Sequence, residues 1–428
     1  MSVTTTPSAG GSSVMRSGVL LVGAILNGAF AVAAMWLAGR ALGLVPFEAL
    51  AQLWTFWGLV AVGVTFAFQQ WEVSRNLGLP TSRRLRVPSD VRLGLLVACI
   101  VVLVLTAVFR VPVFGSSSWV WPLAAATLPV GTAVTGMAYA TLARAGRLRG
   151  LAVVMAAENG ARLLVTGALV SLGAPPVAFA VTIPAGFLVS LLPLVVTQAS
   201  RRSAAKATSI EVGHLPALAM IGSSTNLLVF GGPLLLGAAG GQAALVSALF
   251  LVLIIPRVPL LLVNALVPAV IVASTASVTA GNAARVRRWV VLLSASGGGL
   301  VVLLGPLAYT AADPIAATLF QVGGRFEPST YGLLAVAVVL VLTATVTNPL
   351  LIALGHLKAV ATTWAVVVIS GATLTATGTL ADPVLLATWM SFCAAAVVAS
   401  HILLALLAQP IPRTAFSLDT EEEGSGPS

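Results

Sequence analysis

The sequence predicts an all-α polytopic membrane protein of about twelve transmembrane helices in two parallel six-helix lobes. Three observations predict this class: an apolar composition, twelve hydrophobic runs, and a segment that recurs in both halves. Of the 428 residues, 58% are hydrophobic and only 8% are charged. Soluble domains carry roughly a quarter charged residues, so lipid rather than water is the expected solvent for most of this chain.

A transmembrane helix requires about 20 mostly apolar residues, and the chain offers twelve runs of suitable length. The eighth run is over-long and contains Pro256, Pro259 and Pro268, which predict a kink or an interfacial end. The runs lie at residues 18–39, 48–71, 91–109, 119–143, 151–172, 177–197, 215–237, 243–273, 289–311, 331–354, 358–378 and 384–408.

Basic residues alternate between the loops on the two sides of the predicted membrane. Every even-numbered loop is basic, whereas the odd-numbered loops are nearly free of charge. Cytoplasmic loops carry an excess of Lys and Arg, so both termini are predicted to be cytoplasmic, with the protein in the cytoplasmic membrane. The net charge of +10 belongs to these loops, and nucleic acid is not an expected partner.

A short segment recurs in the two halves. LARAGRLRGLA at 142–152 and LIALGHLKAVA at 351–361 share two leucines, a glycine and an alanine at one offset of 209 residues. Both are predicted turns, between spans 4–5 and 10–11, so the repeat predicts two copies in the same membrane orientation. The predicted divisions are a disordered N-terminus at 1–17, lobes at 18–197 and 215–408, a cytoplasmic linker at 198–214, and a disordered tail at 409–428.

Three stretches of the chain share a family pattern. Residues 33–56 contain Arg40 and Gly43 at the exit of the first span, followed by Glu48 where the pattern usually has a small residue; the other stretches are 250–271 and 315–329. They resemble the first periplasmic turn, the eighth span and the approach to the tenth span of bacterial polysaccharide flippases. These belong to the multidrug/oligosaccharidyl-lipid/polysaccharide exporter superfamily. The resemblance implies a V-shaped, two-lobed bundle that opens alternately to each side, with a lipid-linked oligosaccharide as cargo.

Ionised side chains inside a span cost roughly 2.5–3.5 kcal/mol, so they normally face a cavity or a partner. Glu158 and Arg162 lie four residues apart in the fifth span, on one helical face. They are either a cavity-facing pair that contacts cargo or relays a coupling ion, or a structural ion pair. Arg257 in the eighth span is the leading candidate for binding a diphosphate, which suits guanidinium geometry. The alternative partners are a distant carboxylate or carbonyls freed by the neighbouring prolines.

Four other polar residues are candidates for weaker reasons. Glu72 is a possible coupling-ion site or an interfacial carboxylate, and Arg40 is a periplasmic interfacial anchor or a ligand. Asn27 and Asn226 occupy similar depths in the two halves and are candidates to line a central cleft. Helix–helix hydrogen bonding is the default role of asparagine within a span.

The chain carries no recognisable enzyme motif. It has no HExxH, Walker loop or GxSxG, and its two cysteines lack metal-ligand spacing, so no catalytic residue, metal or cofactor is expected. The predicted function is to flip a polyprenyl-diphosphate-linked oligosaccharide across the membrane for cell-surface polysaccharide synthesis. Glycan polymerase and glycosyltransferase are the expected protein partners. The alternatives are an ion-coupled drug or metabolite exporter of the same superfamily, and a membrane glycan polymerase or glycosyltransferase, which the short outer loops disfavour.

Overall fold

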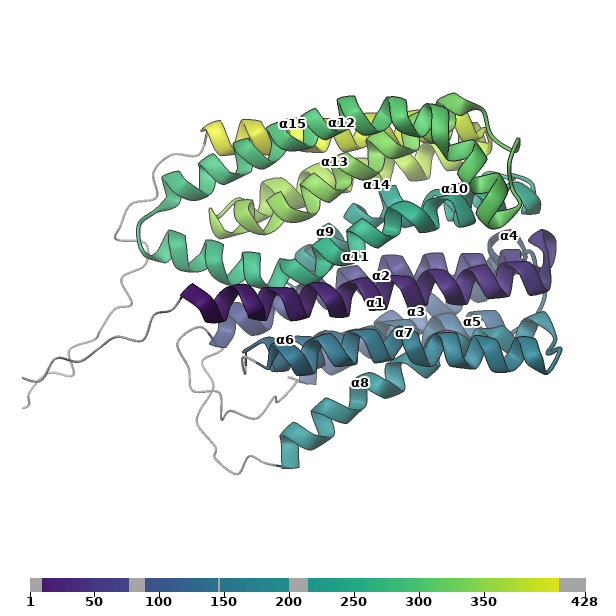
Figure 1. Ribbon diagram of the computed structural model, residues 1–428, viewed down its shortest axis with the longest axis horizontal. Helices are drawn as coiled ribbons and strands as arrows, with labels where there is room; N and C mark the ends of the chain where they lie inside the picture. Colours follow the sequence, from purple (N-terminus) through teal and green to yellow (C-terminus); the bar gives the residue numbers. More distant parts are fainter. Residues whose placement is uncertain (1–9, 77–88, 145–146, 200–214, 408–428) are drawn as a thin grey trace, which may run out of the picture.

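The computed structural model describes residues 10–76, 89–144, 147–199 and 215–407, and this part of the chain contains helices and no strands. The long helices run side by side along one direction (Figure 1). Within the described residues, ten helices are long and apolar enough to cross a membrane, and there are eleven if the bent pair α9–α10 counts as one span. The predicted all-α membrane class is confirmed.

The N-terminal half forms one lobe, whose helices follow the first six predicted spans. The short helix α4 joins the third span to the fourth, and the fourth and sixth spans each begin with a short helical segment. The elements are α1 Gly10–Leu42, α2 Leu44–Asn76, α3 Ser89–Val108, α4 Arg110–Phe114, α5 Val120–Ala126, α6 Leu128–Arg144, α7 Leu148–Ser171, η1 Pro176–Val181 and α8 Thr182–Ala199.

The C-terminal half forms the second lobe. α9 and α10 are bent by 76° at their break, where Gly231 lowers helix stability and Pro233 lacks an amide hydrogen, so the predicted seventh span is broken. The predicted eighth span corresponds to α11, which is one continuous helix. The elements are α9 Leu215–Phe230, α10 Gly232–Ala238, α11 Ala243–Thr279, α12 Ala283–Phe320, α13 Pro328–Ala353, α14 Leu357–Ala376, η3 Thr379–Ala381 and α15 Pro383–Leu407.

The ends of the described chain lie at one end of the bundle. α1 begins at Gly10, inside the segment 1–17 that was predicted to be disordered, and α15 ends at Leu407. Both of these helix ends lie on the same side in Figure 1, as an even number of spans requires. Residues 200–214 of the predicted linker and the predicted tail at 409–428 lie outside the described residues.

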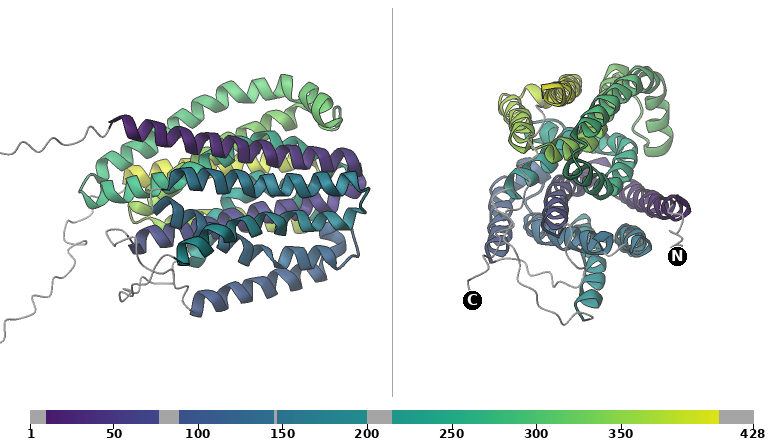
Figure 2. Two further views of the ribbon diagram at one scale, coloured as in Figure 1. Left: turned by 60° about the horizontal axis from the view of Figure 1, so that its bottom comes forward. Right: turned by 90° about the vertical axis from the view of Figure 1, so that its left-hand side faces the viewer.

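Helix pairs that pack in the first lobe recur in the second. α1 packs on α7 as α9 packs on α14, and α2 packs on α6 as α11 packs on α13. α6 contacts α8 in the same way that α13 contacts α15. The repeated segments occupy equivalent places, because 142–152 includes the end of α6 and the start of α7, and 351–361 includes the end of α13 and the start of α14. The end-on view in Figure 2 shows the two halves as two groups of helices.

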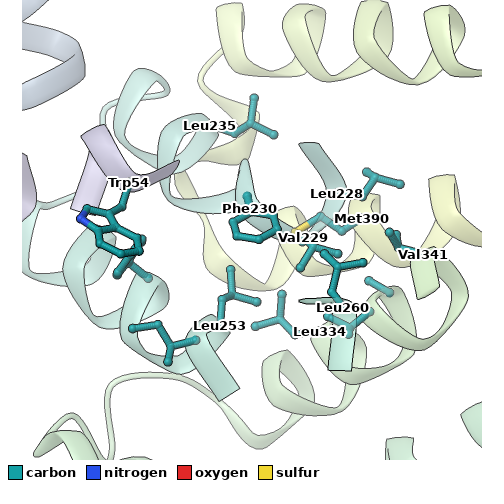
Figure 3. Packing of buried hydrophobic residues seen from close by; sticks show 14 of the residues in the cluster. Trp54, Leu228, Val229, Phe230, Leu235, Leu253, Leu260, Leu334, Val341 and Met390 are labelled. Carbon is teal, nitrogen blue, oxygen red and sulfur yellow. The ribbon is translucent and has the colours of Figure 1, made fainter. Parts of the chain in front are cut away.

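The lobes meet mainly along three helix pairs, α2 with α9, α2 with α11 and α1 with α11. The approach of α2 to α9 is close, since a methyl group on Gly222 would lie 2.8 Å from the Gly63 Cα. Small residues allow such backbone approaches between membrane helices. Buried apolar side chains continue from this seam into the second lobe, where Phe230 of α9 lies among residues that include Leu253 and Leu260 of α11 (Figure 3).

Candidate functional site

The first lobe contains a buried charged cluster built on α7. Glu158 and Arg162 lie one helical turn apart, about 15 Å and 21 Å along the helix from Leu148 at a rise of 1.5 Å per residue. The Arg162 side chain is fully buried and Glu158 is 4% exposed. A buried charge is tolerated only when it is paired and hydrogen-bonded, so the partners of these two groups define the site.

Both oxygens of the Glu158 carboxylate accept hydrogen bonds. Arg162 Nη2 donates to Oε1 at 2.5 Å, as part of an ion pair. The Tyr139 hydroxyl of α6 donates to Oε2 at 2.9 Å. The carboxylate is therefore held from its own helix and from a neighbouring helix.

Two asparagines extend this network to α1. Arg162 Nη1 donates to Asn159 Oδ1. Asn159 Nδ2 in turn donates to Asn27 Oδ1 at 2.7 Å and to the Asn27 carbonyl oxygen at 3.2 Å. Because the Asn159 amide nitrogen is bound to Asn27, its oxygen is turned towards the guanidinium. α1, α6 and α7 are thus joined by one continuous polar network.

Three aromatic rings lie beside the guanidinium. Arg162 Cζ lies 4.4 Å from the ring centroid of Trp57, 5.6 Å from Phe187 and 5.8 Å from Trp54. These distances fall within the range of cation–π attraction. Gly186 of α8 provides the space, because a methyl group there would lie 2.5 Å from Arg162 Cζ.

A cavity of about 110 Å³ adjoins this network. Asn27, Tyr139, Glu158 and Arg162 line it from the first lobe, and Asn264 and Val267 of α11 line it from the second. It has room for several water molecules, but it is smaller than the roughly 300–1,000 Å³ of pockets for drug-sized ligands. The cavity wall thus includes residues of both lobes, so its shape depends on how they are placed.

The structure brings together three of the residues that the sequence singled out: Asn27, Glu158 and Arg162 all line the cavity. Asn226 is not among the cavity-lining residues; it is fully buried, and its Nδ2 donates to the Gly222 carbonyl oxygen of its own helix at 2.9 Å. Arg40 is exposed near the end of α1, with its Cζ 5.3 Å from the Trp36 ring centroid.

Two other candidates cannot be placed by their side chains. Arg257 belongs to α11 and Glu72 belongs to α2, but both side chains lie outside the described residues. Their proposed roles therefore remain predictions. Within the described residues, no group of three His, Cys, Asp or Glu side chains is arranged to hold a metal ion.

Sequence reasoning missed the residues that surround the ion pair from other helices. Tyr139, Trp57, Phe187 and Gly186 belong to α6, α2 and α8. Tyr139 gave one usable signal, since the chain has only three tyrosines and a hydroxyl within a predicted span requires a partner. The others resemble ordinary apolar residues of a membrane helix.

Comparison with solved structures gives the fold. An outward-facing multidrug resistance MATE family transporter of the MOP superfamily matches with a TM-score of 0.60, covering 92% of this chain and 94% of that chain at 14% identity. The chain has the MATE fold. The eukaryotic MATE transporter AtDTX14 matches with a TM-score of 0.61 over 92% and 95% of the two chains, also at 14% identity. An inward-facing multidrug resistance MATE family transporter of the MOP superfamily matches at 0.56 over 92% and 96%, with 12% identity.

Sequence comparisons add nothing to this match: no family model and no curated protein matches the chain. The polysaccharide flippase branch of the exporter superfamily remains a prediction.

Proposed function

We propose that this protein is a membrane transporter that moves its cargo by alternating access of its two lobes. The observation that carries the proposal is the pair of helical lobes with equivalent internal packing, joined mainly through α2–α9, α2–α11 and α1–α11. The MATE fold, found in both outward-facing and inward-facing solved structures, supports it. Two compact units joined along a seam of four helices, α1, α2, α9 and α11, are suited to rocking about that seam.

Three hydrogen bonds between the lobes identify contacts that would change during this motion. Gln52 Nε2 donates to the Pro233 carbonyl oxygen at 3.0 Å, and Ser247 Oγ donates to the Leu44 carbonyl oxygen at 2.6 Å. Trp36 Nε1 donates to the Leu319 carbonyl oxygen at 2.9 Å. All three lie towards the end of the bundle that loop charges predict to be periplasmic. Opening of the lobes on that side would break them.

The cargo that we propose is a polyprenyl-diphosphate-linked oligosaccharide, moved to the outer leaflet for surface polysaccharide synthesis. Its support is the sequence resemblance together with Arg257 on α11, one of the helices at the seam. Arg257 is seven residues before the cavity-lining Asn264, a spacing that predicts one helix face. Since Arg162 is engaged by Glu158 and Asn159, Arg257 is the leading candidate for the diphosphate.

A second candidate cargo is a small organic cation. Two observations favour it: the carboxylate of Glu158 lines the cavity together with aromatic residues such as Trp57, and two solved proteins with this fold are multidrug resistance transporters. Carboxylates with aromatic rings bind organic cations, whereas a diphosphate requires cationic groups. The two cargoes therefore require binding groups of opposite charge in the same protein.

The test uses the full-length protein in proteoliposomes. We expect translocation of a labelled polyprenyl-diphosphate sugar, and we expect Arg257→Gln to slow it about tenfold or more because the diphosphate loses a charged donor. Arg288→Gln, an exposed arginine on α12, is the matched control and should leave the rate unchanged. Transport of tetraphenylphosphonium without lipid-linked sugar would favour the second cargo. Transport of neither compound would contradict the proposal that the protein is a transporter.

A further inference from the structure

The guanidinium of Arg162 has the surroundings of a bound ligand. Its described neighbours are a carboxylate, an amide oxygen and three aromatic rings: Glu158, Asn159, Trp54, Trp57 and Phe187. Each of these groups is attractive to a cation. They come from three helices, α2, α7 and α8, so the enclosure is a feature of the lobe rather than of one helix.

The enclosure is supported independently of Arg162. Tyr139 holds the second oxygen of Glu158, and Asn27 holds the amide of Asn159 with its oxygen towards the guanidinium. Gly186 leaves the volume that the guanidinium fills. A structural i,i+4 ion pair requires only its two members, whereas this one lies in a shaped and separately oriented site.

We propose that the first lobe contains a binding site for a guanidinium-type organic cation, and that the protein's own Arg162 occupies it as a tethered ligand. Glu158 then has its charge compensated from within the chain, and it is not the place where a coupling ion from solution binds. The adjoining cavity of about 110 Å³ provides a route for a free cation when the tethered one is removed. This inference goes beyond the proposed function; it is compatible with the diphosphate cargo, and it makes Glu158 unavailable to a cationic cargo while Arg162 is bound to it.

The experiment removes the Arg162 side chain and supplies a free guanidinium compound in its place. Arg162→Ala in the full-length protein, reconstituted in nanodiscs, is titrated with methylguanidinium, and binding is followed by tryptophan fluorescence because Trp54 and Trp57 line the site. We expect binding at least about tenfold tighter than to the wild type, whose site is filled. Methylurea has a similar shape without the charge and should not bind.

The matched control is the double variant Glu158→Ala/Arg162→Ala. It has the same space without the carboxylate and should bind methylguanidinium no better than the wild type does. Equal binding by the single and double variants would overturn the proposal, since the space alone would then explain it. Absence of binding by a folded Arg162→Ala protein would also overturn it.

Arg162→Ala leaves Glu158 buried without its cation and is prone to misfolding. In that event, the yield of monodisperse protein is compared after expression and purification with and without methylguanidinium. The proposal requires the added cation to restore the single variant at least severalfold. A single variant that is not restored, whether or not the double variant folds, would refute it: the Arg162 side chain would then be part of the lobe's packing.

Discussion

The two lobes share a helix arrangement but fill the same interior position in opposite ways. The offset of 209 residues that relates the repeated turns carries Glu158 to Val367 and Arg162 to Gly371. All four residues are buried. The first lobe thus places an ion pair where the second places a valine and a glycine. A shared fold evidently does not require charge at this position.

The helix that follows compensates for the difference in size. In the first lobe, Gly186 of α8 makes room for the guanidinium of Arg162 on α7. In the second lobe, Gly371 on α14 makes room for the ring of Trp389 on α15, because a methyl group on Gly371 would lie 2.7 Å from the Trp389 Cζ2. In the first lobe the large side chain is on α7 and the glycine is on α8, whereas in the second lobe the glycine is on α14 and the large side chain is on α15. One lobe fills the volume with a charge and the other with an indole.

Three polar contacts between side chains in the interior of the second lobe are neutral, whereas the carboxylate of Asp313, which accepts a hydrogen bond from Tyr331, is on the exposed end of the α12–α13 pair. Asn348 Nδ2 donates to the Thr225 hydroxyl at 3.1 Å, and Trp364 Nε1 donates to Asn348 Oδ1 at 3.1 Å. The Thr347 hydroxyl and His401 Nδ1 lie 2.7 Å apart. Such contacts join membrane helices without a permanent charge. The comparison therefore assigns helix association to this network and cation recognition to the first lobe.

Removal of one charge should have the largest effect. Glu158→Ala leaves Arg162 buried without its counter-ion, and we expect a loss of about 3–5 kcal/mol, the range for breaking a buried ion pair. Val367→Ala at the equivalent position deletes only apolar atoms and should cost less. The comparison is made by the apparent melting temperature in detergent. A smaller shift for Glu158→Ala than for Val367→Ala would mean that the two interiors do not differ as described.

The two glycines give a second test, with a smaller effect. Gly186→Ala should cost up to about 3 kcal/mol, within the range for overpacking, because the added methyl group displaces the guanidinium from Glu158. Introducing Gly186→Ala into an Arg162→Met variant should reduce stability much less, since the unbranched, uncharged methionine adapts its shape. Melting temperatures of the single and double variants measure this coupling. Equal losses in both backgrounds would show that the methyl group contacts something other than the guanidinium.

The sequence alone predicted the membrane class, most of the spans and the position of the ion pair. Long apolar runs between basic loops are governed by the bilayer and are visible in one dimension. Glu158 and Arg162 were found for the same reason, since residues four apart on a helix must be neighbours.

The enclosure could not be predicted, because it depends on how α2, α6 and α8 are rotated about α7. In a membrane protein, both lipid-facing and interior faces are apolar, so hydropathy does not show which side of a helix carries Trp57 or Phe187. The break after Phe230 did have a signal, since Gly231, Gly232 and Pro233 follow one another. The break was nevertheless not predicted, because the residues on both sides of it are apolar and the whole segment was taken as one span.

Two hydroxyl groups provide the finest test of the comparison. Tyr139→Phe removes the donor to the Glu158 carboxylate and should cost about 1.5 kcal/mol, near the upper end for hydrogen bonds within a membrane, because the acceptor is charged. Thr225→Val removes the acceptor of Asn348 without changing the side-chain shape, and about 0.6 kcal/mol is expected for this neutral bond. Melting temperatures of the two variants are compared at equal protein concentration. The sign of the difference between the two losses of stability is decisive. A greater loss from Thr225→Val would place the more strongly bound polar network in the second lobe. The charged pair in the first lobe would then make no special contribution to the stability of that lobe.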